Sequence, residues 1–236
     1  MRSVTRWSEL PRPVYGLTGV RSFSEEVPQG SRRFRQHVNP LSKQYREPIT
    51  IPDWDAQLAQ PQLPIHLDIG CARGKYLMEL AQEKQGVTNF VGVEIRQNVV
   101  NDAIEEAQRL QLRNLVLLHA NMNFQQHLLL PALPAPVQSV SIFHPDPWMK
   151  KKHIKRRLVT PEFVKELASL LPDKTPVYVQ TDVLELFEFM TEIFEASGCY
   201  STHELPENPF GLPTDREKFV MGQGGDIYRV AYHVQH

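Results

Sequence analysis

The stretch Pro64–Gly74, PIHLDIGCARG, decides the fold. It begins as a short apolar run, reaches an acid at Asp68, and ends in a turn that carries Gly70 and Gly74. The residues that follow, KYLMELAQEK, place apolar side chains at the spacing of an amphipathic helix. We therefore expect a buried strand, a tight turn and a helix, which is the repeating unit of a parallel α/β sheet.

Strand-like and helical patterns alternate along the rest of the chain. Strands are predicted at residues 89–95, 114–120, 139–143 and 176–181, with a closing strand near 226–234. Helices are predicted at 98–110 and 184–196. Another helix begins at Thr160, which is followed by proline and glutamate as at a capped N-terminus. This order predicts an α/β fold, with a mostly parallel sheet and helices on both of its faces.

The composition is that of an ordinary globular chain, with 41% hydrophobic and 22% charged residues among 236. A net charge of −1 gives no overall attraction for polyanions, so affinity for nucleic acid has to come from local clusters of charge. The two cysteines, Cys71 and Cys199, make neither a disulfide framework nor a zinc site. Since no secretory h-region, membrane-spanning run or metal-ligand spacing is found, we expect a cytoplasmic protein that uses no metal.

The N-terminal segment differs in composition from the rest. Residues 1–48 contain nine Lys/Arg against four Asp/Glu, with many Pro, Gly and Ser and no sustained period. We therefore divide the chain into a basic, flexible N-terminal arm at residues 1–60 and a folded domain at residues 61–236. The segment RRFRQHVNPLSKQY, from Arg32 to Tyr45, interleaves arginines with aromatic residues. It suits a disordered extension and equally an arm that becomes ordered on nucleic acid.

Polar residues and glycines follow successive predicted strands, at the edge where open α/β sheets bind their ligands. They are Asp68, Gly70, Gly74, Glu94, Asn121 and Asp146. The loop at residues 70–74 lacks the last glycine of a pyrophosphate-binding turn, and the acid before it repels phosphate. That acid suits the ammonium and sulfonium groups of S-adenosyl-L-methionine, while Glu94 is placed for ribose hydroxyls and Asn121 for the adenine edge. Glu94 alone does not separate this cofactor from NAD.

The stretch Phe143–Arg157, FHPDPWMKKKHIKRR, fixes one carboxylate and follows it with positive charge. Two prolines restrict the backbone around Asp146, and Trp148 offers a flat apolar wall. This pair suits guanine, whose N1–H and N2–H₂ donors lie together on one edge. Six cations follow that could hold a phosphate backbone: Lys150, Lys151, Lys152, Lys155, Arg156 and Arg157. The alternative is a core tryptophan beside a solvated basic surface.

These motifs resemble the tRNA (guanine-N7-)-methyltransferase family (TrmB type). The resemblance is carried by FHPDPWMKKKHIKRRLVTPEF and extends through LDIGCARGKYL, FVGVEIRQN, NLVLLHANMN, VQTDVLELF and NPFGLPTDREK, over about residues 64–220. It implies a Rossmann-like, class I methyltransferase fold with a twisted sheet. It also implies methyl transfer from S-adenosyl-L-methionine to N7 of the variable-loop guanine, guanine-46, of tRNA. The implied partner is tRNA, with the protein itself a monomer or a homodimer.

By position, the resemblance implies roles for individual residues. Four of the strand-end residues match cofactor positions: Asp68, Glu94, Asn121 and Asp146. Asp146 also matches the catalytic position. The matching substrate positions are Lys150, Asp182, Thr214, Asp215, Arg216 and Glu217.

Four features depart from the usual family pattern. Asp68 replaces a glutamate, Ala72 replaces a glycine of the first loop, His144 replaces an aromatic residue, and residues 214–217 read TDRE. On the residues alone, three alternatives stay open. They are a class I methyltransferase for another RNA such as rRNA, an NAD-dependent oxidoreductase, and a non-catalytic RNA-binding module.

Overall fold

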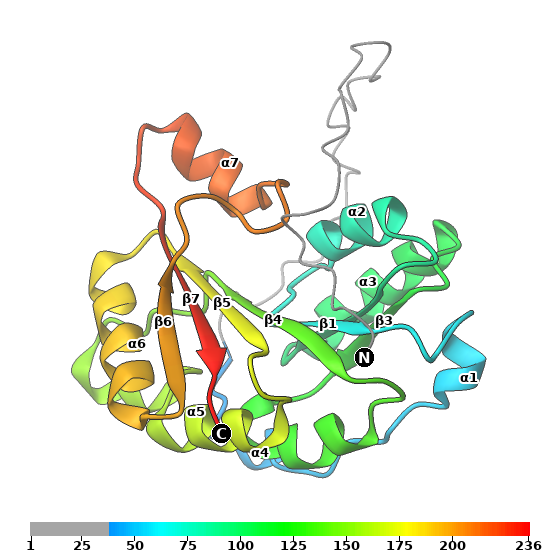
Figure 1. Ribbon diagram of the computed structural model, residues 1–236, viewed down its shortest axis with the longest axis horizontal. Helices are drawn as coiled ribbons and strands as arrows, with labels where there is room; N and C mark the ends of the chain where they lie inside the picture. The colour runs from blue at the N-terminus through cyan, green and yellow to red at the C-terminus, as the bar shows by residue number, and fades with distance from the viewer. Residues whose placement is uncertain (1–37) are drawn as a thin grey trace. The chain divides into compact units, whose positions relative to one another are not determined.

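A computed structural model describes residues 38–236 of the chain. Its centre is a seven-stranded sheet in the order β3-β2-β1-β4-β5-β7-β6 (Figure 1). Neighbouring strands from β3 to β5 pair in parallel, whereas β7 pairs antiparallel with both β5 and β6. The strands are β1 (Ile65–Ile69), β2 (Asn89–Glu94), β3 (Leu115–His119), β4 (Val137–Phe143), β5 (Pro176–Thr181), β6 (Tyr200–Glu204) and β7 (Tyr228–Val234). This confirms the mostly parallel α/β sheet predicted from the sequence.

Helices cover both faces of the sheet, as predicted (Figure 1). The longer ones are α2 (Lys75–Glu83), α3 (Gln97–Arg109), α4 (Met122–Leu129), α5 (Pro161–Leu170), α6 (Leu184–Ser197) and α7 (Asp215–Gly222). α2 and α3 pack on β2 and β3 around one buried apolar cluster, which includes Leu77 and Phe90. α4, α5 and α6 enclose a second and larger cluster on the other face, which includes Phe163 and Phe194.

Local sequence explains several element boundaries. Thr160 caps α5 as predicted, because its hydroxyl accepts a hydrogen bond from the Phe163 N–H at 3.2 Å. Gly74 precedes α2 in the left-handed region, with φ at +66°. A Cβ on Gly74 would lie 3.2 Å from Leu117 Cδ1 on β3. Gly74, predicted to serve the cofactor loop, therefore serves the start and the close packing of α2.

Three elements carry no clear sequence pattern and were not predicted. β6 is an edge strand in which Tyr200 is the buried residue of a largely polar sequence. α7 has no apolar stripe, so its helical form depends on the contacts at its N-terminus. α4 buries two glutamines, Gln125 and Gln126, between Met122 and Leu129, at positions where a helical pattern is expected to carry apolar side chains.

The folded unit begins well before residue 61. Residues 38–60 include α1 (Trp54–Gln57), and both Trp54 and Leu58 are buried in the larger apolar cluster. The indole N–H of Trp54 donates to the Ala132 carbonyl at 2.7 Å. This differs from the boundary predicted at residue 60, because a few apolar anchors in a proline-rich segment show no period. The rest of the predicted arm, residues 1–37, lies outside the described residues.

Two kinds of feature are absent from residues 38–236. No helix in this range is long and apolar enough to cross a bilayer. The same range contains no group of three His, Cys, Asp or Glu side chains arranged to hold a metal ion. Cys71 and Cys199 are free thiols.

Trp54→Ala is expected to lower the free energy of unfolding by about 3 kcal/mol, because it leaves a cavity and removes the donor to the Ala132 carbonyl. The matched change Asp55→Ala, at an exposed position of the same turn, should alter it by less than about 0.5 kcal/mol. Urea denaturation followed by circular dichroism measures both values. If Trp54→Ala changes the free energy of unfolding as little as Asp55→Ala does, this segment does not belong to the folded unit.

Candidate active site

The carboxyl ends of the parallel strands gather the predicted side chains on one edge of the sheet. Following the strand order β3-β2-β1-β4-β5, they lie in the order Asn121, Glu94, Asp68, Asp146 and Asp182. Asp68 and Asp146 flank the place between β1 and β4 where the strand order reverses. Open α/β sheets bind their ligands at such a switch point. The edge is therefore the candidate active site.

Asp68 is a buried acid whose neighbours provide no opposite charge. Its carboxylate accepts a hydrogen bond from the Ser141 hydroxyl at 2.5 Å, and it takes no part in the ion pairs of residues 38–236. Burial raises the pKa of Asp68 to about 7, with the hydrogen bond opposing this rise and the charge of Glu94 adding to it. A Cβ on Gly70, in the turn that follows, would have nothing within 4 Å. The arrangement suits a cationic ligand group, which would neutralise the acid.

Glu94 is held by an arginine that was not predicted. Its Oε1 accepts from the backbone N–H and the Nε of Arg96 at 2.9 and 3.0 Å, and its Oε2 accepts from Nη2 at 3.0 Å. The bonds to Glu94 raise the pKa of Arg96, and the charge of Asp146 contributes to the rise. Arg96 thus balances part of the negative charge at this edge. An arginine two residues after a strand-end acid is the signal that could have revealed the pair.

Asn121, predicted to contact adenine, is the N-cap of α4. Its Oδ1 accepts from the Asn123 N–H at 3.2 Å, and its Nδ2 donates to the Pro40 carbonyl at 2.9 Å. The side chain is buried. Residues near position 40 therefore compete with any ligand for the amide of Asn121.

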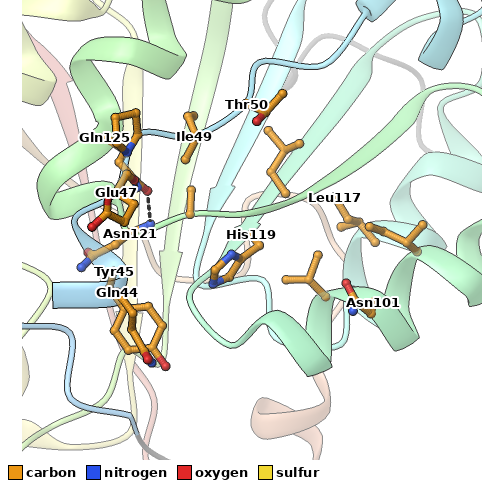
Figure 2. Close-up of a pocket in the computed structure, with 15 residues that line it drawn as sticks. Gln44, Tyr45, Glu47, Ile49, Thr50, Asn101, Leu117, His119, Asn121 and Gln125 are labelled. Carbon is orange, nitrogen blue, oxygen red and sulfur yellow. Dashed lines mark hydrogen bonds between the residues drawn. The ribbon is translucent and has the colours of Figure 1, made fainter. Parts of the chain in front are cut away.

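A pocket of about 400 Å³ lies beside β3, next to Asn121 (Figure 2). Residues 44–50 form one wall and side chains of α3 form another. Tyr45 and His119 meet there edge to face, with ring centroids 6.2 Å apart. The acids Asp68 and Asp146 do not line this pocket, so it neighbours the acidic edge without containing it.

The loop after β4 is strained on both sides of Asp146. His144 and Trp148 have φ angles of +50° and +42°, in the left-handed region that side-chain-bearing residues seldom adopt. Asp146 itself is exposed and lies between two prolines. Such strain persists where surrounding contacts impose it, and it is common at functional sites. The loop therefore presents the carboxylate to solvent in a conformation that its neighbours fix.

His144 is one of these fixing contacts. Its backbone N–H donates to the Gln180 carbonyl at 2.7 Å, and its Nε2 accepts from the Gln180 amide at 2.9 Å. Its Nδ1 lies 3.0 Å from Asp182 Oδ1. Burial lowers the pKa of His144 although Asp182 opposes this, so the neutral ring donates from Nδ1. A phenyl ring at this position could not make these polar links.

Asp182 joins the same loop to α7. Its carboxylate accepts from Arg216 Nε at 3.2 Å and from Arg216 Nη2 at 2.5 Å. Burial would raise the pKa of Asp182, but the hydrogen bonds from Arg216 and His144 hold it below its usual value. The predicted substrate residues Asp182 and Arg216 are therefore in contact with each other.

α7 is anchored by a capping box made by Thr214 and Glu217. The Thr214 hydroxyl accepts from the Glu217 N–H at 3.1 Å, and the Glu217 carboxylate accepts from the Thr214 N–H at 2.7 Å. The same carboxylate accepts from Asn208 at 3.0 Å and from Arg229 at 2.7 Å. Burial would raise the pKa of Glu217, but these hydrogen bonds hold it below its usual value.

This placement separates the buried members of residues 214–217 from the exposed ones. Glu217 is 1% exposed and its oxygens are occupied, so it and Thr214 position α7 and do not offer a surface to a substrate. Asp215 and Arg216 are exposed on the same turn. Asp215 lies 3.7 Å from Lys75 at the start of α2. These two are the members of the motif that a substrate could reach.

The basic run after Asp146 divides into exposed and buried cations. The exposed ones, on and before the short 3₁₀ turn η4 (Lys151–Arg156), are Lys150, Lys151, Lys152 and Lys155. Arg156 lies over the Trp148 ring, 5.1 Å from its centroid. Arg157 is buried, donates from Nε to the Pro147 carbonyl at 2.8 Å, and lies 4.3 Å from the Phe189 ring. The guanidinium of Arg157, for which an RNA contact was predicted, therefore holds the loop.

Comparisons with known proteins show what the chain is similar to. A family model described as "Putative methyltransferase" matches residues 62–230. The tRNA (guanine-N(7)-)-methyltransferase of Microcystis aeruginosa is 45% identical over 208 residues, which cover 86% of this chain and 98% of that protein. The protein of the same name from Thermosynechococcus vestitus is 46% identical over 200 residues, covering 84% and 92%. A solved SAM dependent methyltransferase from Aquifex aeolicus aligns with a TM-score of 0.51 at 15% identity, over 78% of this chain and 90% of that one, and supports the fold alone.

Glu217→Ala is expected to loosen α7, because it removes the capping box and leaves the buried groups of Arg229 and Asn208 without their acceptor. A local loss of about 2 kcal/mol corresponds to amide hydrogen exchange roughly 30-fold faster across residues 215–222. Asp215→Ala, on the exposed side of the same turn, serves as the control and should change exchange little. Unchanged exchange in Glu217→Ala would show that the capping box does not hold the helix.

Proposed function

Because the chain belongs to the tRNA (guanine-N7-)-methyltransferases, we propose that it transfers a methyl group from S-adenosyl-L-methionine to N7 of guanine-46, the variable-loop guanine of tRNA. Membership rests on the family match over residues 62–230 and on relatives that are 45% and 46% identical over most of their length. The observation that supports the site is the gathering of Asp68, Glu94 and Asp146 at the switch point. We place the enzyme in the cytoplasm, as a monomer or a homodimer.

The methyl donor fits the residues that end β1, β2 and β3. Asp68 is the proposed acceptor for its ammonium group, since a buried acid with a raised pKa and no ion pair favours a cation. Glu94 is the proposed partner of the ribose hydroxyls, and the hydrogen bonds from Arg96 hold that carboxylate in place. Gly70 leaves room for close approach, and Asn121 is proposed for the adenine edge.

The acceptor nitrogen needs no general base, because N7 of guanine carries its lone pair in the plane of the ring. S-Adenosyl-L-methionine supplies an activated methyl group, so the N7–CH₃ bond forms as the S–CH₃ bond breaks and the sulfonium becomes a thioether. Asp146 is the proposed catalytic residue. It would accept hydrogen bonds from guanine N1–H and N2–H₂, orient N7, and stabilise the positive charge that the base gains.

The tRNA is proposed to contact two groups of exposed side chains. Lys150, next to the Asp146 loop, is assigned to a phosphate or a base oxygen, and the cations of η4 to the phosphates that follow. Arg216, held by Asp182, and its neighbour Asp215 are assigned to a second contact on α7. We propose that the basic segment of residues 1–37 adds to the affinity for tRNA.

Methyl transfer from labelled S-adenosyl-L-methionine to an unmodified tRNA transcript tests this function. The label should map to guanine-46 by cleavage specific for N7-methylguanine, and a transcript with adenine at that position should take up none. Asp146→Asn should lower kcat by roughly 100-fold or more while S-adenosylhomocysteine still binds, because the negative charge that faces the base is lost. Label on rRNA and none on tRNA would show that rRNA is the substrate, and no label on either RNA would overturn the proposal.

The double change Lys151→Ala with Lys152→Ala should weaken tRNA binding and reduce its dependence on salt. Removing two phosphate contacts lowers the slope of log affinity against log salt concentration by roughly 1 to 2. Arg157→Ala is the contrasting variant, because its buried guanidinium holds the Pro147 carbonyl. It should lower the melting temperature and leave the slope unchanged. The assignment fails if Arg157→Ala changes the slope and the lysine variant does not.

A further inference from the structure

We infer that Ser141, backed by His66 and Ser139, is a positioning residue that keeps the Asp68 carboxylate ionised and aimed at the ammonium group of S-adenosyl-L-methionine. The inference rests on the proposed function, which places that ammonium group against Asp68. It adds to the cofactor site three side chains of the sheet core, each with 0% of its surface exposed.

The four side chains form one continuous hydrogen-bonded chain across two strands. In the parallel register of β1 with β4, His66 is paired with Ser139 and Asp68 with Ser141. Alternate residues of a strand point to the same face, so all four lie on one face of the sheet. Ser139 Oγ lies 2.8 Å from His66 Nδ1, His66 Nε2 lies 3.0 Å from Ser141 Oγ, and Ser141 Oγ lies 2.5 Å from Asp68 Oδ1.

The charge on Asp68 fixes which group donates in each hydrogen bond between these four side chains. An ionised carboxylate can only accept, so the Ser141 hydroxyl donates to Asp68. The oxygen of Ser141 is then free to accept from Nε2–H of His66, and Nδ1 accepts from the Ser139 hydroxyl. Every member is satisfied when Asp68 is charged and His66 is neutral. The bond to a charged acceptor is also the strongest in the chain.

The surroundings of His66 hold it in the neutral form that this direction requires. Its ring meets the rings of Phe90 and Phe210 edge to face, at centroid distances of 5.8 and 4.7 Å and interplanar angles of 63° and 69°. Burial lowers the pKa of His66 to about 3. At neutral pH the imidazole therefore has one N–H to donate, and Ser141 receives it.

Within residues 38–236, the titratable groups that face Asp68 from other elements supply no positive charge. Glu94 on β2 is a carboxylate whose charge raises the pKa of Asp68. Cys71 in the following turn and Tyr76 on α2 are neutral, because burial raises the pKa of each. The hydrogen bond from the serine hydroxyl is the contact that favours the ionised form of Asp68. A row of hydrogen-bonded polar side chains in an otherwise apolar core costs free energy, and this row ends on Asp68, the acid proposed to bind the ammonium group.

Two ligands and one variant separate this role from a structural one. S-Adenosylhomocysteine carries the ammonium group, whereas 5′-methylthioadenosine shares its nucleoside and lacks the amino-acid portion. Ser141→Ala should weaken the binding of S-adenosylhomocysteine about 10-fold at pH 7, as expected for the loss of a hydrogen bond to a charged group. The affinity for 5′-methylthioadenosine should stay within about 2-fold, because that ligand does not use Asp68.

The expected pH dependence of binding follows from the direction in which Ser141→Ala changes the pKa of Asp68. Without the Ser141 donor the pKa of Asp68 rises further, so more of the acid is protonated and unable to hold a cation at pH 7. As the pH is raised to 9, Asp68 ionises in both proteins and the ratio of their affinities should fall towards one. Taking this ratio cancels the titration of the ligand's own amine. Isothermal titration calorimetry from pH 6 to 9 measures it, and Ser141→Thr, which keeps the hydroxyl, should restore binding.

The controls separate failure of this inference from failure of the proposed function. Thr175→Val removes a buried hydroxyl at the start of β5, remote from Asp68 in the sheet, and should leave both ligands unaffected. Asp68→Asn should weaken S-adenosylhomocysteine, and if it does not, the assignment of Asp68 to the cofactor is wrong. The inference is overturned if Asp68→Asn weakens the binding of S-adenosylhomocysteine but Ser141→Ala does not. It is also overturned if Ser141→Ala weakens the binding of both ligands equally. If Ser141→Ala does not fold, Ser139→Ala takes its place. The ratio of wild-type to variant affinity for S-adenosylhomocysteine should then fall with rising pH in the same way but at smaller amplitude. A ratio that does not change with pH would count equally against the inference.

Discussion

The parallel pairing of β1 with β4 is the constraint on which the rest of the site depends. It sets Asp68 beside Ser141 and brings two strand ends, each followed by a carboxylate, to one edge of the sheet. Acids gathered in this way repel one another unless each finds a partner. Arg96 balances Glu94, and its pKa is also raised by the charge of Asp146, whereas Asp68 is buried and makes no ion pair within residues 38–236. The fold thus holds an acid ready for a positively charged ligand.

The substrate side is built by contacts that fix a strained loop in advance. The left-handed backbone at His144 and Trp148 opposes folding. Hydrogen bonds from β5 and the guanidinium of Arg156, which lies over the Trp148 ring, offset this cost. The hydrogen bond between Asp182 and Arg216 connects this loop to α7, and Glu217 completes the capping box at the first turn of that helix. A reaction that needs no base gains most from such positioning, because the rate depends on aligning the lone pair with the methyl group.

The sequence was sufficient where a local pattern maps directly onto a place in the fold. Acids and glycines after apolar runs located the active edge, since every parallel strand ends there. It was insufficient where burial depends on distant partners. Arg157 and Lys152 look alike in a basic run, and only the contacts of Arg157 with Phe189 and the Pro147 carbonyl, which the fold brings together, separate them. The alternation of His66 with Asp68 is visible in β1, but its meaning depends on knowing that β4 lies beside it.

A crystal structure of the full chain with S-adenosylhomocysteine is the measurement that tests this account most directly. We expect the amino nitrogen of the ligand within about 3.2 Å of an Asp68 oxygen, with the Ser141 hydroxyl still bound to that carboxylate. We also expect the ribose beside Glu94, with the side chain of Asp146 left open towards the sulfur. A ligand seated in the pocket beside β3, with no contact to Asp68, would contradict the account.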